Sequence, residues 1–203
     1  MNLSFRIAAV AGLCCAIAGF AAAAAEGERS GIGWYAGTGI GPGSGAKYKL
    51  NGQWVTFEDG LKNATDTSPL IAINLVNAGV TLTPNLLFGA SVSAVGKTGK
   101  VGTNDAHLQI NNYLAAVTYF PFEQGLFVRG GVGLSNILID TGAVSNRTSG
   151  TGILVGAGYA LPVARRHNIT FTADHSRQSY SGSSTKPDSS QFTAVYLGYM
   201  YRR

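Results

Sequence analysis

Few residues of this sequence have the types and spacing that catalysis requires. His175-Ser176 places a base beside a nucleophile, and Gly96-Lys97-Thr98 is similar to the end of a phosphate-binding loop. Neighbouring residues on a strand point to opposite faces, so His175 and Ser176 cannot act as one catalytic pair there. A phosphate-binding loop must open a helix, and no helical pattern follows Thr98. We therefore predict no catalytic residues.

Cofactor and metal motifs fail for similar reasons. Gly37-Thr-Gly39-Ile-Gly41 lacks the following helix and the acidic partner of a dinucleotide-binding turn. The two cysteines, Cys14 and Cys15, lie in a leader that we expect to be removed. That loss excludes disulfides, thiolate metal sites and cysteine nucleophiles in the mature chain. We predict no cofactor and no metal.

Two charged residues, Arg129 and Asp174, share strand faces with glycine, serine and threonine. If those faces point into a narrow barrel, an unpaired charge there would be costly. One interpretation is an interior salt-bridge and hydrogen-bond network that fills the lumen. The other is a gate whose charged lining sets solute selectivity. Their predicted strands, the fifth and the seventh, are not neighbours, so direct pairing stays open.

The stretch 42–68 is the candidate for binding. It is long and polar, and it combines aromatic and basic residues that suit contact with a partner or with lipopolysaccharide: Lys47, Tyr48, Lys49, Trp54 and Phe57. Exposed loops held by a rigid scaffold often carry function. The competing interpretation is a loop that is merely solvated.

Alternating strands must position these residues. Charged residues make up 12% of the 203 residues, against about 25% in soluble domains, and there are 28 glycines. On the segment that begins at Leu126, Val128, Val132 and Leu134 share one face, while Phe127, Arg129, Gly131, Gly133 and Ser135 share the other. Seven further segments follow this period of two, although 108–120 carries apolar residues on both faces. The eight predicted strands span 31–41, 70–82, 86–95, 108–120, 126–138, 150–161, 168–177 and 191–201.

This pattern predicts an all-β fold, an eight-stranded antiparallel transmembrane β-barrel. Apolar residues opposite small and charged ones fit a closed barrel with lipid outside. A soluble sandwich or lipocalin-like barrel is the alternative, and its polarity would be reversed. Long polar loops after the first, third, fifth and seventh strands, with short turns after the second, fourth and sixth, match the outer-membrane arrangement.

Residues 1–25 stand apart from the barrel, which we assign to residues 26–203. Arg6, the apolar run from Ile7 to Phe20 and the small residues from Ala21 to Ala25 predict a secretory signal peptide cleaved near Ala25. An uncleaved membrane anchor is the alternative, because the uncharged run is about long enough to span a bilayer. We favour cleavage and an outer-membrane location.

The sequence resembles the small outer-membrane β-barrel superfamily of the OmpA/OmpX type. The resemblance covers nearly the whole mature chain and rests on the signal peptide, Gly33-Trp-Tyr-Ala-Gly37, Leu82-Thr-Pro-Asn-Leu86, Tyr119-Phe-Pro-Phe122 with Val128-Arg-Gly-Gly131, and Val155-Gly-Ala-Gly-Tyr159. It implies the fold and recognition by the barrel assembly machinery. Such barrels usually end on an aromatic residue, whereas Arg202-Arg203 follow Tyr201 here.

The predicted function is non-enzymatic: envelope integrity, or surface interaction through the long loops, with outer-membrane lipid, lipopolysaccharide or an extracellular ligand as partners. A small channel or transporter for small or hydrophobic solutes is the alternative. A lipid A hydrolase is a third reading, but the His-x-Ser-Asn pattern of the barrel deacylases is broken by Arg177 and Gln178. The net charge of +5 gives no reason to expect nucleic acid.

Overall fold

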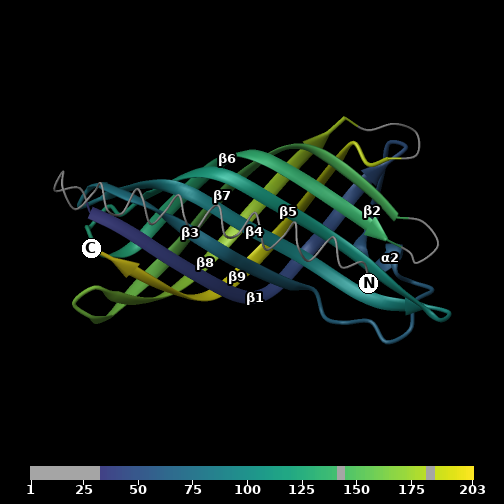
Figure 1. The fold of residues 1–203 in the computed structure, drawn as a ribbon, viewed down its shortest axis with the longest axis horizontal. Coiled ribbons are helices and arrows are strands. Elements are labelled where there is room, and N and C mark those ends of the chain that lie inside the picture. Colours follow the sequence, from purple (N-terminus) through teal and green to yellow (C-terminus); the bar gives the residue numbers. More distant parts are fainter. Residues whose placement is uncertain (1–32, 141–144, 182–185) are drawn as a thin grey trace.

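Eight long strands close into an antiparallel barrel in the computed structural model, which describes residues 33–140, 145–181 and 186–203 (Figure 1). Each strand pairs with its neighbours in the sequence of strands, and β1 pairs with both β3 and β9, which closes the barrel. The strands of the barrel are β1 (Gly33–Leu50), β3 (Ile71–Thr83), β4 (Leu86–Val101), β5 (Asn104–Tyr119), β6 (Gly125–Asp140), β7 (Ser145–Ala164), β8 (His167–Tyr180) and β9 (Ser189–Arg202). The predicted eight-stranded fold is confirmed.

The two ends of the barrel differ. Short turns at 84–85, 120–124 and 165–166 lie at one end together with Gly33 and Arg203, and we call this the turn end. The opposite, loop end carries the four-residue strand β2 (Gln53–Thr56), which pairs with β1, and the single helical turn α2 (Phe57–Gly60). The predicted signal peptide, residues 1–25, lies outside the described residues, as do 141–144 and 182–185 of the predicted loops.

Several strands run further toward the loop end than the sequence pattern predicts. The stretch 42–68 begins as strand, because β1 continues to Leu50 and turns into β2 through Asn51-Gly52. Both turn residues have positive φ, 51° and 79°, which the Asn-Gly pair tolerates in a tight hairpin. The long loop predicted between the third and fourth strands is also wrong, since β4 and β5 meet at a two-residue turn with Gly102 at φ 64°.

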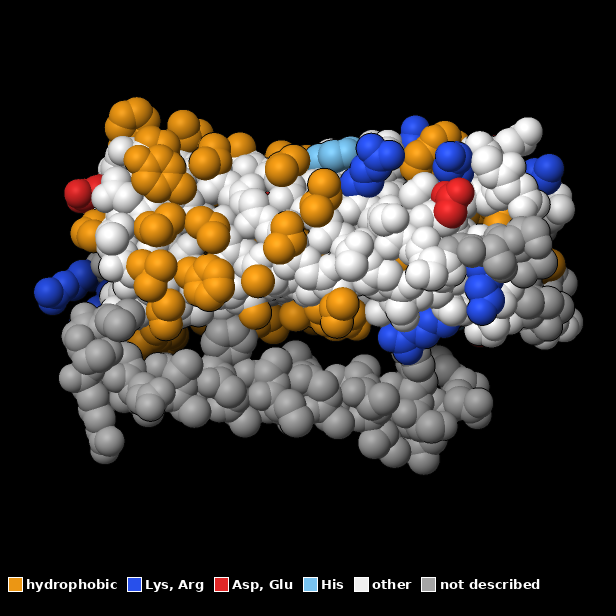
Figure 2. Space-filling view, turned by 90° about the horizontal axis from the view of Figure 1, so that it is seen from above, with side chains coloured by type: hydrophobic (Ala, Val, Ile, Leu, Met, Phe, Trp, Pro, Cys, Tyr) orange, Lys and Arg blue, Asp and Glu red, His pale blue; other side chains and the backbone are white. Residues whose placement is uncertain are grey.

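The half of the barrel nearest the turn end, the belt half, has the predicted polarity. On β6 the outward Val132 and Leu134 are 62% and 67% exposed, while the inward Phe127 and Arg129 are buried. β7 and β8 alternate in the same way, with Val155 and Phe171 outward. Figure 2 shows hydrophobic side chains gathered over this half and charged side chains over the other. The outward apolar stretch is about nine residues on a strand such as β6, which suits a bilayer crossing.

The remaining part of the barrel, the loop half, has the opposite polarity. On β5 the inward Leu108 and Ile110 are fully buried, while His107, Gln109 and Asn111 point outward. This reversal explains why the fourth predicted strand has apolar residues on both faces. Outward Tyr113, Val117 and Tyr119 face the lipid side in the belt half, whereas inward Leu108, Ile110, Leu114 and Ala116 are buried in the barrel. The strand therefore carries apolar residues on both faces.

Candidate functional site

The centre of the lumen holds a buried ion pair between Arg129 and Asp174. Arg129 Nε donates to Asp174 Oδ1 at 2.8 Å, and Nη2 donates to Oδ2, so the guanidinium and the carboxylate pair through two bonds. The exposed fractions of the two residues are 7% and 1%. With the Asn74 amide oxygen turned inward, that oxygen accepts from both Nη atoms at 3.2 Å. The strongly buried charges are therefore paired and hydrogen-bonded, as such charges require.

A glycine makes this pairing possible across an intervening strand. Arg129 on β6, Gly156 on β7 and Asp174 on β8 occupy one row of the sheet. A Cβ added at Gly156 would lie 2.1 Å from Asp174 Oδ1 and 2.8 Å from the Ala173 carbonyl oxygen. Because Gly156 has no side chain, the Arg129 guanidinium can cross over β7 and reach the Asp174 carboxylate. The direct pairing that sequence reasoning left open is present in the structure.

A second polar chain fills the lumen toward the loop end. Asn112 Nδ2 donates to Ser176 Oγ at 3.0 Å, and Gln178 Nε2 donates to Asn112 Oδ1 at 3.2 Å. The chain continues through Ser190, whose hydroxyl donates to Gln178 Oε1 at 2.6 Å and contacts the Tyr180 hydroxyl at 2.8 Å. Sequence reasoning missed this network, although Ser176 and Gln178 continue the inward alternation that begins at Asp174.

Two apolar layers close the lumen above and below the polar centre. The loop-end layer is built on Tyr48, Phe57, Leu108, Ile137 and Phe192. The turn-end layer consists of Tyr35, Leu87, Phe120, Phe127, Ala160 and Met200. Between them, a cavity of about 20 Å³ lies beside Arg129, room for roughly one water molecule. The interior is a packed core with a polar middle.

His175 and Ser176 lie on opposite faces, as their spacing predicts. Ser176 is fully buried and its hydroxyl donates to the Ile153 carbonyl oxygen at 3.1 Å. His175 points outward, and its Nδ1 lies 3.0 Å from Thr193 Oγ1. The two side chains cannot form a nucleophile–base pair in this arrangement. Among the described residues, no group of three or more His, Cys, Asp or Glu side chains is arranged to hold a metal ion.

The five loop candidates divide between two faces. Tyr48 and Phe57 are buried inside the barrel, with 6% and 0% of their surfaces exposed, so their expected availability to a partner is wrong. Both are drawn inward because β1 continues as a strand and α2 folds over the loop end. Lys47 and Lys49 are on the outward face of β1, and the 40% exposed Trp54 pairs with Lys49 across the hairpin. Lys47 Nζ lies 5.1 Å from the centre of the Trp54 ring.

A further cation joins this outward group. Arg177 on β8 and Lys47 on β1 both pair with Gln191 on β9, so the three residues form one row. Arg177 is exposed, and it follows the outward Phe171, Ala173 and His175 along its strand. We call Lys47, Lys49, Trp54 and Arg177 the basic row. It lies where the outward face changes from apolar to polar.

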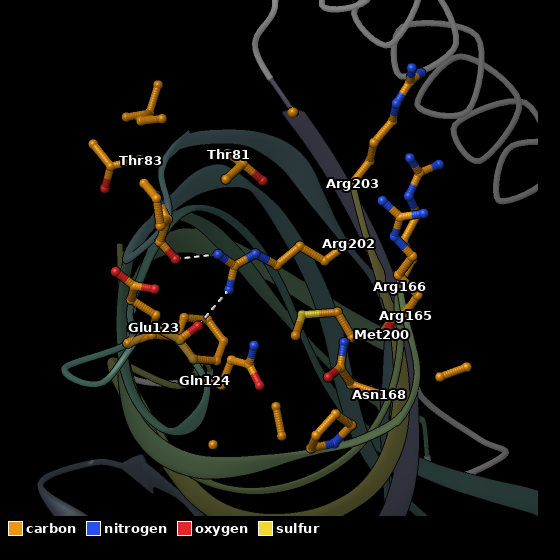
Figure 3. Close-up of a pocket in the computed structure, with 18 residues that line it drawn as sticks. Thr81, Thr83, Glu123, Gln124, Arg165, Arg166, Asn168, Met200, Arg202 and Arg203 are labelled. Carbon is orange, nitrogen blue, oxygen red and sulfur yellow. Dashed lines mark hydrogen bonds between the residues drawn. The ribbon is translucent and has the colours of Figure 1, made fainter.

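The turn end carries a mouth that Arg202 crosses. The cavity there has a volume of about 580 Å³ and is lined by residues of the short turns, by Gly33 and by the C-terminal Arg202 and Arg203 (Figure 3). The Arg202 guanidinium donates to the carbonyl oxygens of Glu123, at 3.1 Å, and Pro84, and it lies 5.2 Å from the Phe120 ring centre. A residue that departs from the usual terminal pattern thus ties two turns to the last strand.

Comparisons with known proteins identify the fold. No family model and no curated protein matches the sequence. The structure is similar to Neisserial surface protein A, with 13% identity and a TM-score of 0.51 over 83% of this chain and 96% of that one. It is equally similar to Ail, the attachment invasion locus protein of Yersinia pestis, solved with the heparin analogue sucrose octasulfate, with 13% identity and a TM-score of 0.51 over 85% and 99%. The chain therefore has the fold of the small eight-stranded outer-membrane barrels, which confirms the fold that the sequence resemblance implies. Among the described residues, helices long and apolar enough to span a membrane are absent.

Proposed function

We propose that the protein is an integral outer-membrane barrel that binds lipopolysaccharide phosphate groups through its basic row. The observation that carries this proposal is the position of Lys47, Lys49 and Arg177 just beyond the apolar belt. With the turn end in the periplasm, that level is where the phosphates of the outer leaflet would lie. The role is one of envelope integrity and surface contact, without catalysis.

The chemistry of the row suits a phosphorylated glycolipid. Arginine pairs with phosphate through two nitrogen donors, and lysine adds a mobile point charge. Trp54 offers an aromatic face at the interface, where tryptophan is typically enriched. Ail was solved with the heparin analogue sucrose octasulfate, and that polyanion is a second probe to apply to the basic row of this chain.

The packed lumen supports a surface role over the alternative of a channel. A solute would have to displace both apolar layers and the ion pair between Arg129 and Asp174. We expect no discrete openings when the refolded barrel is placed in a planar bilayer. Reproducible openings in the parent that change in Arg129→Ala would favour the channel and make the two charged residues part of its lining.

The proposal is tested by lipopolysaccharide binding to the refolded barrel in neutral nanodiscs. The triple variant Lys47→Gln/Lys49→Gln/Arg177→Gln should weaken binding by at least tenfold, because each lost cation near anionic lipid contributes about 1 kcal/mol. The matched control is Lys62→Gln/Lys100→Gln/Lys186→Gln, which removes the same charge from exposed positions at the loop tips. Equal affinity of parent and triple variant would refute the proposal, and equal losses in both variants would reduce it to general charge attraction.

A further inference from the structure

The turn end carries a second group of cations on the outer wall. Arg165 and Arg166 are exposed residues of the turn between β7 and β8, and His167 is the exposed first residue of β8. Figure 3 shows Arg165, Arg166 and Arg203 together at the rim of the wall, while Arg202 crosses the mouth beside them. Arg165 and Arg166 also line the mouth that Arg202 crosses, so the group lies where the mouth meets the outer wall. The group lies at the opposite end of the barrel from the basic row.

Aromatic side chains of neighbouring strands surround these cations. Arg166 Nη1 donates to the Tyr201 hydroxyl at 3.3 Å, and the Tyr201 ring stacks on Trp34 with a centroid distance of 4.8 Å. The His167 ring lies edge-on to Tyr201, at 5.3 Å, and its Nδ1 hydrogen-bonds the Tyr199 hydroxyl. The result is a fixed platform of rings, from β1, β8 and β9, with Arg166 held at its edge.

The platform lies on the lipid-facing side of the barrel. Tyr199 and Tyr201 continue the outward face of β9, where Val195 and Leu197 are 50% and 56% exposed. Tyrosine and tryptophan at the end of an apolar belt mark the level of the headgroups in a bilayer. Arginines at that level reach the lipid phosphates while their stems stay on apolar surface.

From this arrangement we propose that Arg165 and Arg166, with the platform of Trp34, His167, Tyr199 and Tyr201, form a binding site for an anionic phospholipid of the periplasmic leaflet. The inference rests on the membrane placement in the proposed function. The two guanidinium groups bind the lipid phosphate, and the rings pack against the glycerol and upper acyl region. A free phosphate would lack the second contact, so the site selects the lipid-borne group.

The test counts lipids retained by the full barrel. The protein is reconstituted in nanodiscs of equal parts phosphatidylglycerol and phosphatidylcholine with identical acyl chains, and native mass spectrometry identifies the lipids that stay bound. We expect phosphatidylglycerol to exceed phosphatidylcholine several-fold in the parent, and the ratio to fall toward one in Arg165→Gln/Arg166→Gln. Arg165→Lys/Arg166→Lys should keep part of the enrichment, because it retains charge but loses the paired donors. Lys62→Gln/Lys186→Gln, with the same loss of charge at the loop end, should retain the parent ratio.

Other outcomes overturn the site in distinct ways. A parent ratio near one refutes anionic lipid binding, and equal falls in both Gln variants show that net charge alone sets retention. Displacement of the retained lipid by millimolar inorganic phosphate refutes the lipid-selective site in favour of a free-phosphate site. A barrel that does not enter nanodiscs at all contradicts the proposed function itself, whereas failure of lipid enrichment in an inserted barrel contradicts only this inference.

Discussion

The belt half and the loop half share one continuous hydrogen-bonded sheet, but the outward face is apolar in the belt half and polar in the loop half. In the belt half, Val132 and Val155 face outward and the ion pair between Arg129 and Asp174 faces inward. In the loop half, Leu108 and Ile137 are buried inside, and Gln109 and Ser149 face outward. A strand that runs through both halves keeps its extended backbone, while the kind of residue on its outward face changes from apolar to polar.

The difference teaches that the surroundings of the barrel, and not its backbone, set the side-chain pattern. Lipid accepts apolar side chains at no cost, so the interior of the belt half can be polar if every polar group finds a partner. Water around the loop half restores the ordinary arrangement of an apolar core and a polar surface. In the proposed membrane placement, the row where the two patterns meet lies at the level of the outer interface.

The largest effect should follow loss of one partner of the buried ion pair. Asp174→Ala leaves the Arg129 charge buried without its carboxylate, which we expect to lower the free energy of unfolding by about 3–5 kcal/mol. Urea unfolding in lipid vesicles, followed by tryptophan fluorescence, measures this loss. Arg129→Ala/Asp174→Ala should lose less than the sum of the two single variants. Strict additivity would show that the pair does not act as a unit.

An arginine introduced on the outward face of β7 should destabilise the barrel in the belt half and not in the loop half. Val155→Arg puts a cation against the lipid-facing belt and should cost about 2–4 kcal/mol near the middle of the bilayer. Ser149→Arg, six residues away on the same face of β7, should change stability by less than about 0.5 kcal/mol. Insertion into vesicles and urea unfolding measure both. Similar losses at the two positions would contradict the proposed level of the interface.

The two glycines Gly156 and Gly130 offer a finer comparison of inside with outside. Gly156→Ala forces a methyl group into the path between Arg129 and Asp174 and should cost about 1–3 kcal/mol. Gly130→Ala is the control, because its Cβ would point outward with the nearest atom, the Leu154 carbonyl oxygen, at 3.7 Å. Unfolding of the two variants under identical conditions tests the difference. Equal losses of unfolding free energy in the two variants would mean that the lumen adjusts freely around the ion pair.

The smallest effect should come from the mouth. Arg202→Ala removes the bonds to the Pro84 and Glu123 carbonyl oxygens at a half-exposed position, so we expect a loss of about 1 kcal/mol. The fraction of barrel that stays folded on an unboiled gel, measured over a temperature ramp, reports the change. Arg203→Ala serves as the control for charge at the same chain end. A loss equal to that of Asp174→Ala would make the mouth, and not the ion pair, the main constraint on the barrel.

The sequence predicted the belt half well and the loop half poorly, for one physical reason. A two-residue period with apolar residues opposite glycines defines a lipid-facing strand, so the outward faces of β4, β6, β7, β8 and β9 were correct. Beyond the belt the outward face becomes polar, so a strand residue such as Tyr48 was predicted to be part of a polar loop. Asn51-Gly52 was the available signal that β1 turns back as a hairpin rather than entering a long loop.

The chain's residues by themselves determined the barrel class, the strand count, the inward direction of Arg129 and Asp174, and the separation of His175 from Ser176. Each of these follows from local periodicity, which is a property of the extended backbone. Only the tertiary structure decided that Gly156 opens a path between two charges on non-adjacent strands. The same holds for the alignment of Lys47 with Arg177 and for the reach of Arg202 across the mouth. These contacts depend on register and on barrel closure, which join residues far apart in the sequence.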